Sequence, residues 1–189
     1  MDKIKYKYGV LFDMDGVLFD TGLYHKHSWY KLAEKEGFQM SDEFFEETFG
    51  MQNYQILPKL ARRQLSKEEI DRMADYKEQA YRKSIKGNIE LLGGVEQLLT
   101  DLKANGIKTA IGTSTPRENL DFLLAHITVA EYFDQTVAAE DVKNGKPAPD
   151  TYRKAAEKTG LNPTDCVVIE DAVAGVQAGK AAGSAVIAV

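Results

Sequence analysis

Four short polar stretches contain the residue types that phosphoryl transfer requires, and each lies in a loop after a short apolar run. In the first, Asp13 and Asp15 stand two residues apart and precede Gly16, where the chain can turn. Asp-x-Asp-Gly could be a plain polar turn, or the opening of a calcium loop, although the later acidic ligands of such a loop are absent. It could also be a phosphoryl-transfer site, with Asp13 as nucleophile and Asp15 as general acid and base.

The second and third stretches supply hydroxyl groups and a cation. Thr113, Ser114 and Thr115 could donate hydrogen bonds to phosphate oxygens, or they could cap the next helix. Lys146 precedes Pro147 in a loop with two prolines, which restrict the backbone and could aim the lysine at a fixed point. The alternative is a solvated loop lysine.

The fourth stretch begins with Glu170 and Asp171, a carboxylate pair that could bind a divalent cation or cap the helix that follows. Each stretch alone is weak evidence. Together they provide carboxylates, hydroxyls and one lysine, which are the groups needed to hold Mg²⁺, offset phosphate charge and orient a phosphoryl group.

The hydrophobic pattern predicts an α/β fold with a doubly wound parallel sheet. After residue 93, short apolar runs alternate with stretches of helical period, as in consecutive βα units. We expect strands over 8–12, 108–112, 135–138, 166–169 and 184–189, and helices over 95–104, 117–125, 150–159 and 172–182. Ligands of such sheets bind outside the carboxyl ends of the strands, where the polar stretches begin.

The segment 22–86 differs from the rest because its hydrophobic period is helical throughout. Ser66 and Glu69 fit a capping box at the start of one of its helices. We therefore expect an α/β core made of residues 1–18 and 93–189, interrupted by an all-helical cap over 19–92. Closure of the cap over the strand ends would exclude water, with hinges near 17–21 and 92–94.

The composition excludes several classes of protein. The chain has 189 residues, a net charge of −5 and 43% hydrophobic residues, which suits a folded domain rather than a disordered chain. No apolar run approaches the roughly 20 residues of a membrane span, and no basic block indicates a nucleic-acid partner. The single cysteine, Cys166, fits a reducing compartment. We expect a cytoplasmic protein, and a monomer because its size does not demand oligomerisation.

The order and context of these motifs resemble the haloacid dehalogenase (HAD) superfamily of phosphohydrolases, and within it the β-phosphoglucomutase-like group, whose helical cap is inserted after the first strand. The resemblance covers nearly the whole chain. It implies that Asp13 attacks phosphorus and becomes a transient aspartyl phosphate, while Asp15 protonates the leaving oxygen and then takes a proton from water. It also implies that Thr113 and the amides after it hold phosphoryl oxygens, and that Lys146 links the nucleophile to the phosphate.

A cofactor is implied by the same resemblance. Mg²⁺ would be held by the Asp13 carboxylate, the Asp15 backbone carbonyl and Asp171, with Glu170 either as a further ligand or behind the ligands. A carboxylate is a modest nucleophile and would stand beside a phosphate dianion, so the metal and the lysine are both required.

A phosphatase and a mutase share the same core chemistry, so residues of the cap and of the loop after the second core strand must distinguish them. Thr21 and His25 match positions that control the acid/base aspartate and the approach of the sugar in β-phosphoglucomutases, although His25 could instead be a solvated helix residue. Asn53 stands where the mutases carry an arginine for a second phosphate. After the second strand, Thr115 and Arg117 stand where the mutases carry a Ser-Lys pair, and Arg117 could compensate only in part.

We therefore predict a Mg²⁺-dependent phosphatase that acts on a small phosphomonoester, a sugar phosphate. The alternatives are a β-phosphoglucomutase and a non-catalytic binding protein of the same fold, which would have no need for Asp15. The predicted substrate-binding residues are Thr21, His25, Asn53, Ser114, Thr115 and Arg117, and further cap side chains that could face the cleft are Gln52 and Lys77.

The chain stops in the apolar run 184–189. Relatives of the resembled group usually continue through a further helix and a short strand. We therefore expect an exposed sheet edge, lower stability and a tendency to associate. All the matched motifs precede this point, so we expect the protein to keep its catalytic activity without the further helix and strand.

Overall fold

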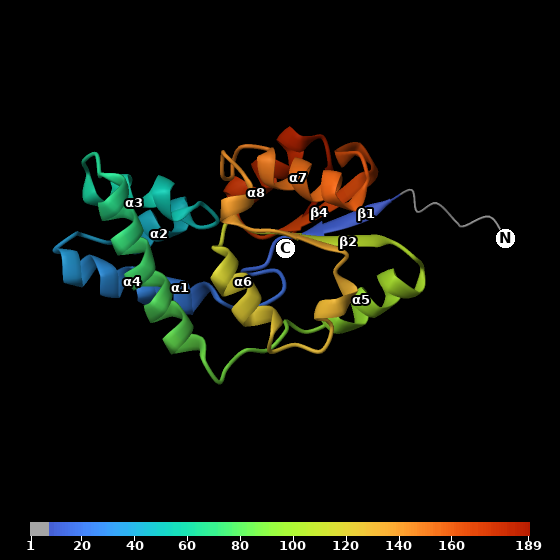
Figure 1. Cartoon of the computed structure of the whole chain (residues 1–189), viewed down its shortest axis with the longest axis horizontal. Coiled ribbons are helices and arrows are strands. Elements are labelled where there is room, and N and C mark those ends of the chain that lie inside the picture. The colour runs from blue at the N-terminus through green and yellow to red at the C-terminus, as the bar shows by residue number, and fades with distance from the viewer. Residues whose placement is uncertain (1–7) are drawn as a thin grey trace.

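A five-stranded parallel sheet forms the centre of the molecule (Figure 1). The computed structural model of the chain describes residues 8–189. The strands are β1 (Gly9–Phe12), β2 (Lys108–Gly112), β3 (Gln135–Val137), β4 (Cys166–Glu170) and β5 (Ala185–Ala188). Their order across the sheet is β3-β2-β1-β4-β5, with every neighbouring pair parallel. The predicted doubly wound fold is confirmed.

Helices cover both faces of this sheet, because strands buried on both sides alternate their side chains between two cores. Helices α5 (Val95–Ala104) and α6 (Arg117–Leu124) lie on one face, and α7 (Asp150–Thr159) and α8 (Val173–Ala182) lie on the other (Figure 1). In β1, Leu11 packs into the cluster on the α7–α8 side, whereas Phe12 packs into the cluster on the α5–α6 side.

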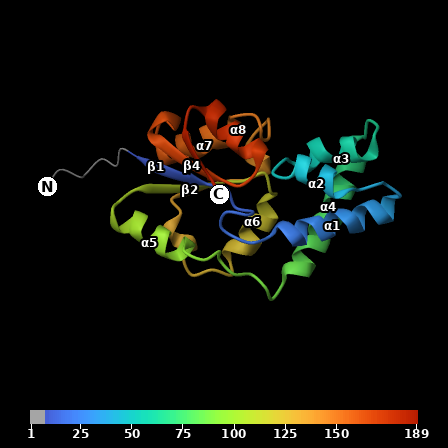
Figure 2. The same cartoon turned by 180° about the vertical axis from the view of Figure 1, so that it is seen from behind.

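Four further helices lie beyond one end of the sheet, and we call them the cap (Figures 1 and 2). They are α1 (Gly22–Glu36), α2 (Asp42–Thr48), α3 (Asn53–Ala61) and α4 (Lys67–Ile85). Their own hydrophobic cluster is centred on Trp29, Leu32, Leu57 and Met73. The expected boundaries at 18/19 and 92/93 stay a prediction, and the first seven residues of the predicted core lie outside the described chain.

The two connections between core and cap run beside each other. Phe19 forms an isolated β-bridge with Leu91, and the Leu92 amide donates to the Leu18 carbonyl at 2.9 Å. These contacts lie in or next to the segments predicted as hinges, 17–21 and 92–94. Movement at the hinges stays a prediction, to be checked by comparing open and closed forms of the protein.

β5 lies at one edge of the sheet, where the side chain of Ile187 is exposed. Neither the expected loss of stability nor the expected association is tested by this arrangement. Across residues 8–189, no helix combines the length and the apolar character that crossing a membrane would take.

Glycine in α8 lets the end of β4 lie close to the helix. A Cβ placed on Gly175 would lie 1.6 Å from Oε1 of Glu170, the last residue of β4. A Cβ placed on Gly22, at the start of α1, would meet nothing within 4 Å. The observed position of the Glu170 carboxylate therefore requires a residue without a side chain at position 175.

We predict that Gly175→Ala destabilises the protein by about 1–3 kcal/mol, because the added methyl displaces a buried carboxylate or the helix that faces it. Urea unfolding followed by circular dichroism measures this loss, and Gly22→Ala is the matched control expected to show none. Equal unfolding midpoints for the two variants would contradict the close approach described above.

Candidate active site

The predicted polar stretches meet at the carboxyl ends of three adjacent strands. Phe12 of β1 is in register with Ile111 of β2 and with Ile169 of β4. The residues that follow therefore lie level with one another, and the Asp13 amide donates to the Ile169 carbonyl at 3.0 Å. Strand pairing thus brings together side chains that are far apart in the sequence.

Lys146 is completely buried between two carboxylates, so the alternative of a solvated loop lysine is wrong. Its Nζ lies 2.6 Å from Asp13 Oδ1 and 2.6 Å from Glu170 Oε1. Burial opposes the charge on this lysine, but the two carboxylates outweigh burial and raise the pKa of Lys146 above its ordinary value. The lysine therefore stays charged and touches the predicted nucleophile.

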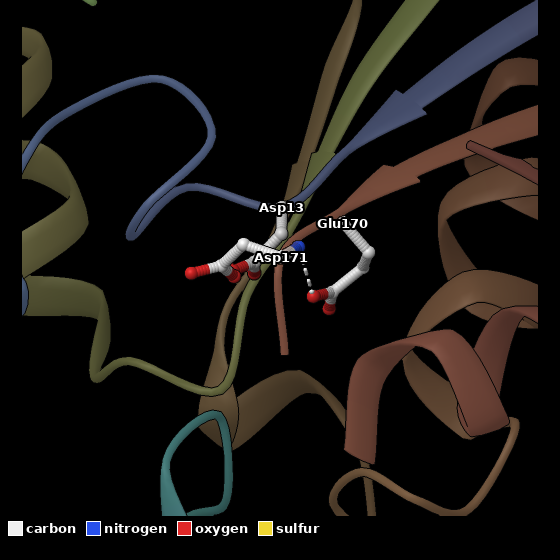
Figure 3. A group of neighbouring side chains, drawn as sticks. All are labelled: Asp13, Glu170 and Asp171. Carbon is white, nitrogen blue, oxygen red and sulfur yellow. Dashed lines mark hydrogen bonds between the residues drawn. The ribbon is translucent and has the colours of Figure 1, made fainter. Parts of the chain in front are cut away.

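The Glu170 carboxylate is saturated by protein donors. Besides Lys146, its Oε1 accepts from the Tyr152 hydroxyl at 2.7 Å, and its Oε2 accepts from the amides of Asp171 and Ala172, each at 3.0 Å. Figure 3 shows the Glu170 carboxylate at the Asp171 amide, while the carboxyl groups of Asp13 and Asp171 lie together on the other side of that amide. The contacts therefore favour a place for Glu170 behind the ligands of a metal ion.

Asp13 and Asp171, by contrast, form a group that fits a hard divalent cation. Together with Glu170 they offer oxygen atoms that all lie within 4.8 Å of one another. Oδ1 of Asp171 is buried and has no hydrogen-bond partner among residues 8–189. Burial, followed by the charge of Glu170, raises the pKa of Asp171 to about 6, and burial likewise raises the pKa of Asp13. A bound cation would stabilise both ionised carboxylates.

Gly16 makes room for this arrangement. Its φ is +81°, a backbone region that favours glycine. A Cβ at this position would lie 1.9 Å from Oδ2 of Asp171. Position 16 therefore requires glycine both for the turn and for the approach of the carboxylate.

Asp15 accepts three side-chain hydrogen bonds. Thr21 Oγ1 donates to Oδ1 at 2.6 Å, His25 Nε2 lies 3.1 Å from the same oxygen, and Thr115 Oγ1 donates to Oδ2 at 2.6 Å. Burial favours the neutral acid, but His25 and the two hydroxyls outweigh it and hold the pKa of Asp15 below its ordinary range. In this conformation Asp15 is a carboxylate, the form a general base needs.

The protonation pattern of His25 follows from its second partner. The Lys77 ammonium can only donate, and its Nζ lies 2.8 Å from His25 Nδ1. Nδ1 therefore accepts, which leaves Nε2 to donate to Asp15. The ring is buried and stacks on Tyr81 at 4.0 Å between centroids, so the alternative of a solvated helix residue is wrong.

The hydroxyls after β2 have different partners. Oγ1 of Thr113 accepts from the Thr115 amide at 3.1 Å, and the Thr115 hydroxyl is used by Asp15 rather than left free for a distant phosphate. Ser114 Oγ is buried and has no hydrogen-bond partner among the described residues. Because it also lines the cavity, it can donate to a phosphate oxygen.

Arg117 does not reach the site, contrary to the prediction that it partly replaces a mutase lysine. Its guanidinium pairs with Asp141 and donates to Thr136 Oγ1 at 2.8 Å. Arg117 begins α6, and its side chain contacts Thr136 within β3 and Asp141 beyond the end of that strand. Local carboxylate and hydroxyl partners therefore hold the cation away from the cavity.

A cavity of about 40 Å³ lies between the strand ends and the cap. That volume holds only a few water molecules, so a sugar phosphate would require the cap to move. The predicted residues that line it are Asp13, Asp15, His25, Asn53, Lys77, Thr113, Ser114 and Thr115. Thr21, Lys146, Glu170 and Asp171 lie behind or beside them through the contacts given above.

Contacts between α3 and core loops hold the cap over this cavity. Tyr54 Oη accepts from the Gly145 amide at 2.9 Å, and Gln55 Nε2 donates to the Lys146 carbonyl at 3.3 Å. Gln52, predicted as a candidate for the cleft, instead donates to the Ala139 carbonyl at 3.2 Å. Its side chain therefore joins cap to core and does not line the cavity.

Three polar residues near the site were not predicted from the sequence: Tyr152, which supports Glu170, and Glu78 and Asn119, which bind each other between cap and core. The sequence does contain a signal that could have identified Glu78. Ala74, Glu78 and Tyr81 have the i, i+4, i+7 spacing of one helix face, so the sequence places a carboxylate on the apolar stripe of α4.

Comparison with known proteins agrees with this geometry. The sequence pattern of the haloacid dehalogenase-like hydrolases matches residues 10–189. The chain belongs to this family. It is 34% identical to the fructose-1-phosphate phosphatase YqaB of Escherichia coli, covering 93% of this chain and 92% of that protein. It is 33% identical to a phosphorylated carbohydrates phosphatase of Thermotoga maritima, covering 92% of this chain and 81% of that protein.

The fold resembles that of a mutase as well. The crystal structure of a β-phosphoglucomutase from Clostridium difficile superposes with a TM-score of 0.88 at 33% identity, covering 96% of this chain and 84% of that one. The predicted family and its β-phosphoglucomutase-like group are confirmed, and the phosphatase relatives support an enzyme of the HAD phosphatase type.

We predict that Lys146→Met destabilises the protein by about 3–5 kcal/mol, because Asp13 and Glu170 are then left buried without a counter-ion. Lys143→Met, which removes an exposed lysine from the same loop, is the control and should change stability little. Urea unfolding of both variants measures the difference. If both unfold like the unmodified protein, the ion pair does not stabilise the strand ends.

Proposed function

We propose that the protein is a Mg²⁺-dependent phosphatase that hydrolyses a sugar phosphate through an aspartyl phosphate on Asp13. The observation that carries the proposal is the environment of Asp13. Its carboxylate faces the cavity, is bonded to buried Lys146, and lies within 4.8 Å of an Asp171 carboxylate whose Oδ1 has no partner in the described part of the chain. A buried carboxylate with one cation on it and room for another suits nucleophilic attack on a phosphate dianion.

The reaction follows from the groups in place. An oxygen of Asp13 attacks phosphorus, and the bond from phosphorus to the sugar oxygen breaks as the new ester forms. Asp15, once protonated, gives its proton to the leaving oxygen. In the second half, Asp15 as a carboxylate takes a proton from water, which attacks the phosphorus and releases phosphate and Asp13. The ionised form of Asp15 held by Thr21, His25 and Thr115 suits this second half.

The remaining residues bind and orient the phosphoryl group. Lys146 offsets the charge of nucleophile and phosphate, and the hydroxyl of Ser114 and the turn at Thr113 face the phosphoryl oxygens. Mg²⁺, when bound, would supply further positive charge. Asp13, the Asp15 carbonyl and Asp171 would hold it, while Glu170 fixes the lysine.

Hydrolysis is favoured over the mutase alternative by the cap. Asn53, in place of the mutase arginine, donates to Glu78 at 2.8 Å, and Arg117 is engaged elsewhere. The sugar-phosphate substrate is supported by the names of the phosphatase relatives. We further propose a cytoplasmic protein, since its lone cysteine is buried and free, and a monomer, because a chain of 189 residues is large enough to form its own core. We keep β-phosphoglucomutase activity as the second candidate because Thr21 and His25 contact Asp15.

We predict that Mg²⁺ raises the melting temperature, because a ligand that binds only the folded state stabilises it by about 2.7 kcal/mol at a hundredfold excess over Kd. Thermal unfolding with and without Mg²⁺ measures the shift. Asp171→Asn should lose it, while Asp75→Asn, which alters an exposed residue of α4, should keep it. A shift that survives in Asp171→Asn would place the metal elsewhere.

We predict that the unmodified protein releases phosphate from a sugar phosphate in a panel that also contains nucleotides and pyrophosphate. Asp13→Asn should reduce release by about a thousandfold or more with the fold retained, and Asp75→Asn should not. The same assay with β-glucose 1-phosphate and a bisphosphate activator separates the alternatives. Glucose 6-phosphate formed without phosphate release would establish the mutase, and no turnover of any compound would favour a binding protein.

A further inference from the structure

The cap side of the cavity has an unusual balance of charge. Within the described chain, Lys77 of α4 is the single lysine or arginine that lines the cavity, and its side chain is buried. The phosphate end of the site, in contrast, has Lys146 and the predicted metal behind it. Lys77 would therefore be the lysine or arginine available to pair with a second anionic group of a substrate at the cap side.

Lys77 is already neutralised from within the cap. Its Nζ lies 2.9 Å from Glu78 Oε1, and its other close partner is His25 Nδ1 at 2.8 Å. Glu78 is also buried and also lines the cavity. The ion pair contributes no net charge to the cap wall.

The position of Glu78 is held by two amides. Asn53 Nδ2 donates to its Oε1 at 2.8 Å, and Asn119 Nδ2 donates to its Oε2 at 2.7 Å. The orientation of Asn119 is defined in turn, because its Oδ1 accepts from Arg82 Nη1 at 2.5 Å. Burial favours the neutral acid, but the Lys77 ammonium and the hydrogen bond from Asn53 outweigh it and lower the pKa of Glu78. Glu78 is therefore a fixed carboxylate in the cavity wall.

Most of the remaining cap wall is apolar, formed by Trp29, Phe45, Phe49, Met51 and Ile56. The hydroxyl of Thr48, which also lines the cavity, donates to the Phe44 carbonyl of its own helix. A phosphate placed against this wall would lose its hydration and would face a buried carboxylate, and like charges brought together in this way cost several kcal/mol. A hydroxyl group can instead donate to Oε2 of Glu78, which accepts one described bond, while the C–H face of a sugar packs on the apolar side chains.

We infer that Glu78 is a specificity-determining residue, which admits a neutral polyhydroxyl leaving group and rejects substrates that carry a second phosphate. The inference rests on the proposed phosphatase function and adds the chemical class of its substrate. It also gives a physical reason for hydrolysis, because a mutase must hold a bisphosphate in this cavity and Glu78 opposes that.

A purely structural role for Glu78 makes a different prediction. Glu78 and Arg82 on the cap bind Asn119 on the core, so the same residues also join the closed cap to α6. Loss of that link alone would change the turnover of every substrate by a similar factor. The ratio between a monophosphate and a bisphosphate separates the two roles.

The test compares kcat/KM for fructose 1-phosphate and fructose 1,6-bisphosphate in the presence of Mg²⁺. We expect the unmodified protein to prefer the monophosphate by at least about tenfold. Glu78→Gln keeps the size of the side chain and frees the charge of Lys77, so this preference should fall by about tenfold or more. Glu78→Asp, which keeps the charge, should retain the preference.

The matched control is Glu118→Gln. Glu118 is a solvent-exposed partner of Arg82 and does not line the cavity, so its loss removes the same charge without altering the wall. An unchanged preference in Glu78→Gln, or equal use of the two compounds by the unmodified protein, would overturn the inference. If fructose 1-phosphate is not cleaved, glucose 1-phosphate and glucose 1,6-bisphosphate form the equivalent pair.

Calorimetric binding separates failure of this inference from failure of the proposed function. In an Asp13→Asn background, adding Glu78→Gln should tighten the binding of the bisphosphate relative to the monophosphate by about tenfold or more, whether or not the unmodified protein turns over. Absence of phosphate release would overturn the proposed function alone, whereas an unchanged binding ratio would overturn the inference.

Discussion

The structure depends on one buried lysine held between two carboxylates. Lys146 joins Asp13, which follows β1, to Glu170, which ends β4, and all three side chains are buried. Such a group is stable only if every charge keeps its partner, since an unpaired buried ion costs several kcal/mol. The close approach of α8 at Gly175 and the hydroxyl of Tyr152 both serve to hold this group in one geometry.

A second buried ion pair organises the cap, and the two pairs have different consequences. At the strand ends, Lys146 faces carboxylates that can share a further cation, which makes that end suited to a phosphate dianion. In the cap, Lys77 is matched by Glu78 inside an apolar wall. The cavity therefore has a strongly polar end and an electrically balanced end, and under the proposed function this difference would give a sugar phosphate one orientation.

Much of the fold and the chemistry could be predicted because the signals are local. Apolar runs and helical periods depend on neighbouring residues, and strand ends in a parallel sheet meet at one edge wherever they lie in the chain. The predicted ends of the core strands and helices therefore differ from the observed ones by at most one residue. Asp13 and Thr113 came together for the same reason. Lys146 lies in the loop before α7 and reaches them through its ion pairs with Asp13 and Glu170. Prediction failed for Arg117 and Gln52, whose long side chains found partners that sequence position does not reveal.

The sequence by itself determined the kind of chemistry, because carboxylates, hydroxyls and a lysine after parallel strands allow few other uses. Only the tertiary structure decided which charges remain available. From the sequence, Lys77 and Arg117 were both candidates to face the cleft. In the structure, Lys77 is neutralised by Glu78 in the cavity wall, and Arg117 is held outside the cavity by Asp141. Glu78 meets Asn119 across 41 residues of chain. Pairing between separate elements depends on how they pack, and periodicity within one element contains no information about it.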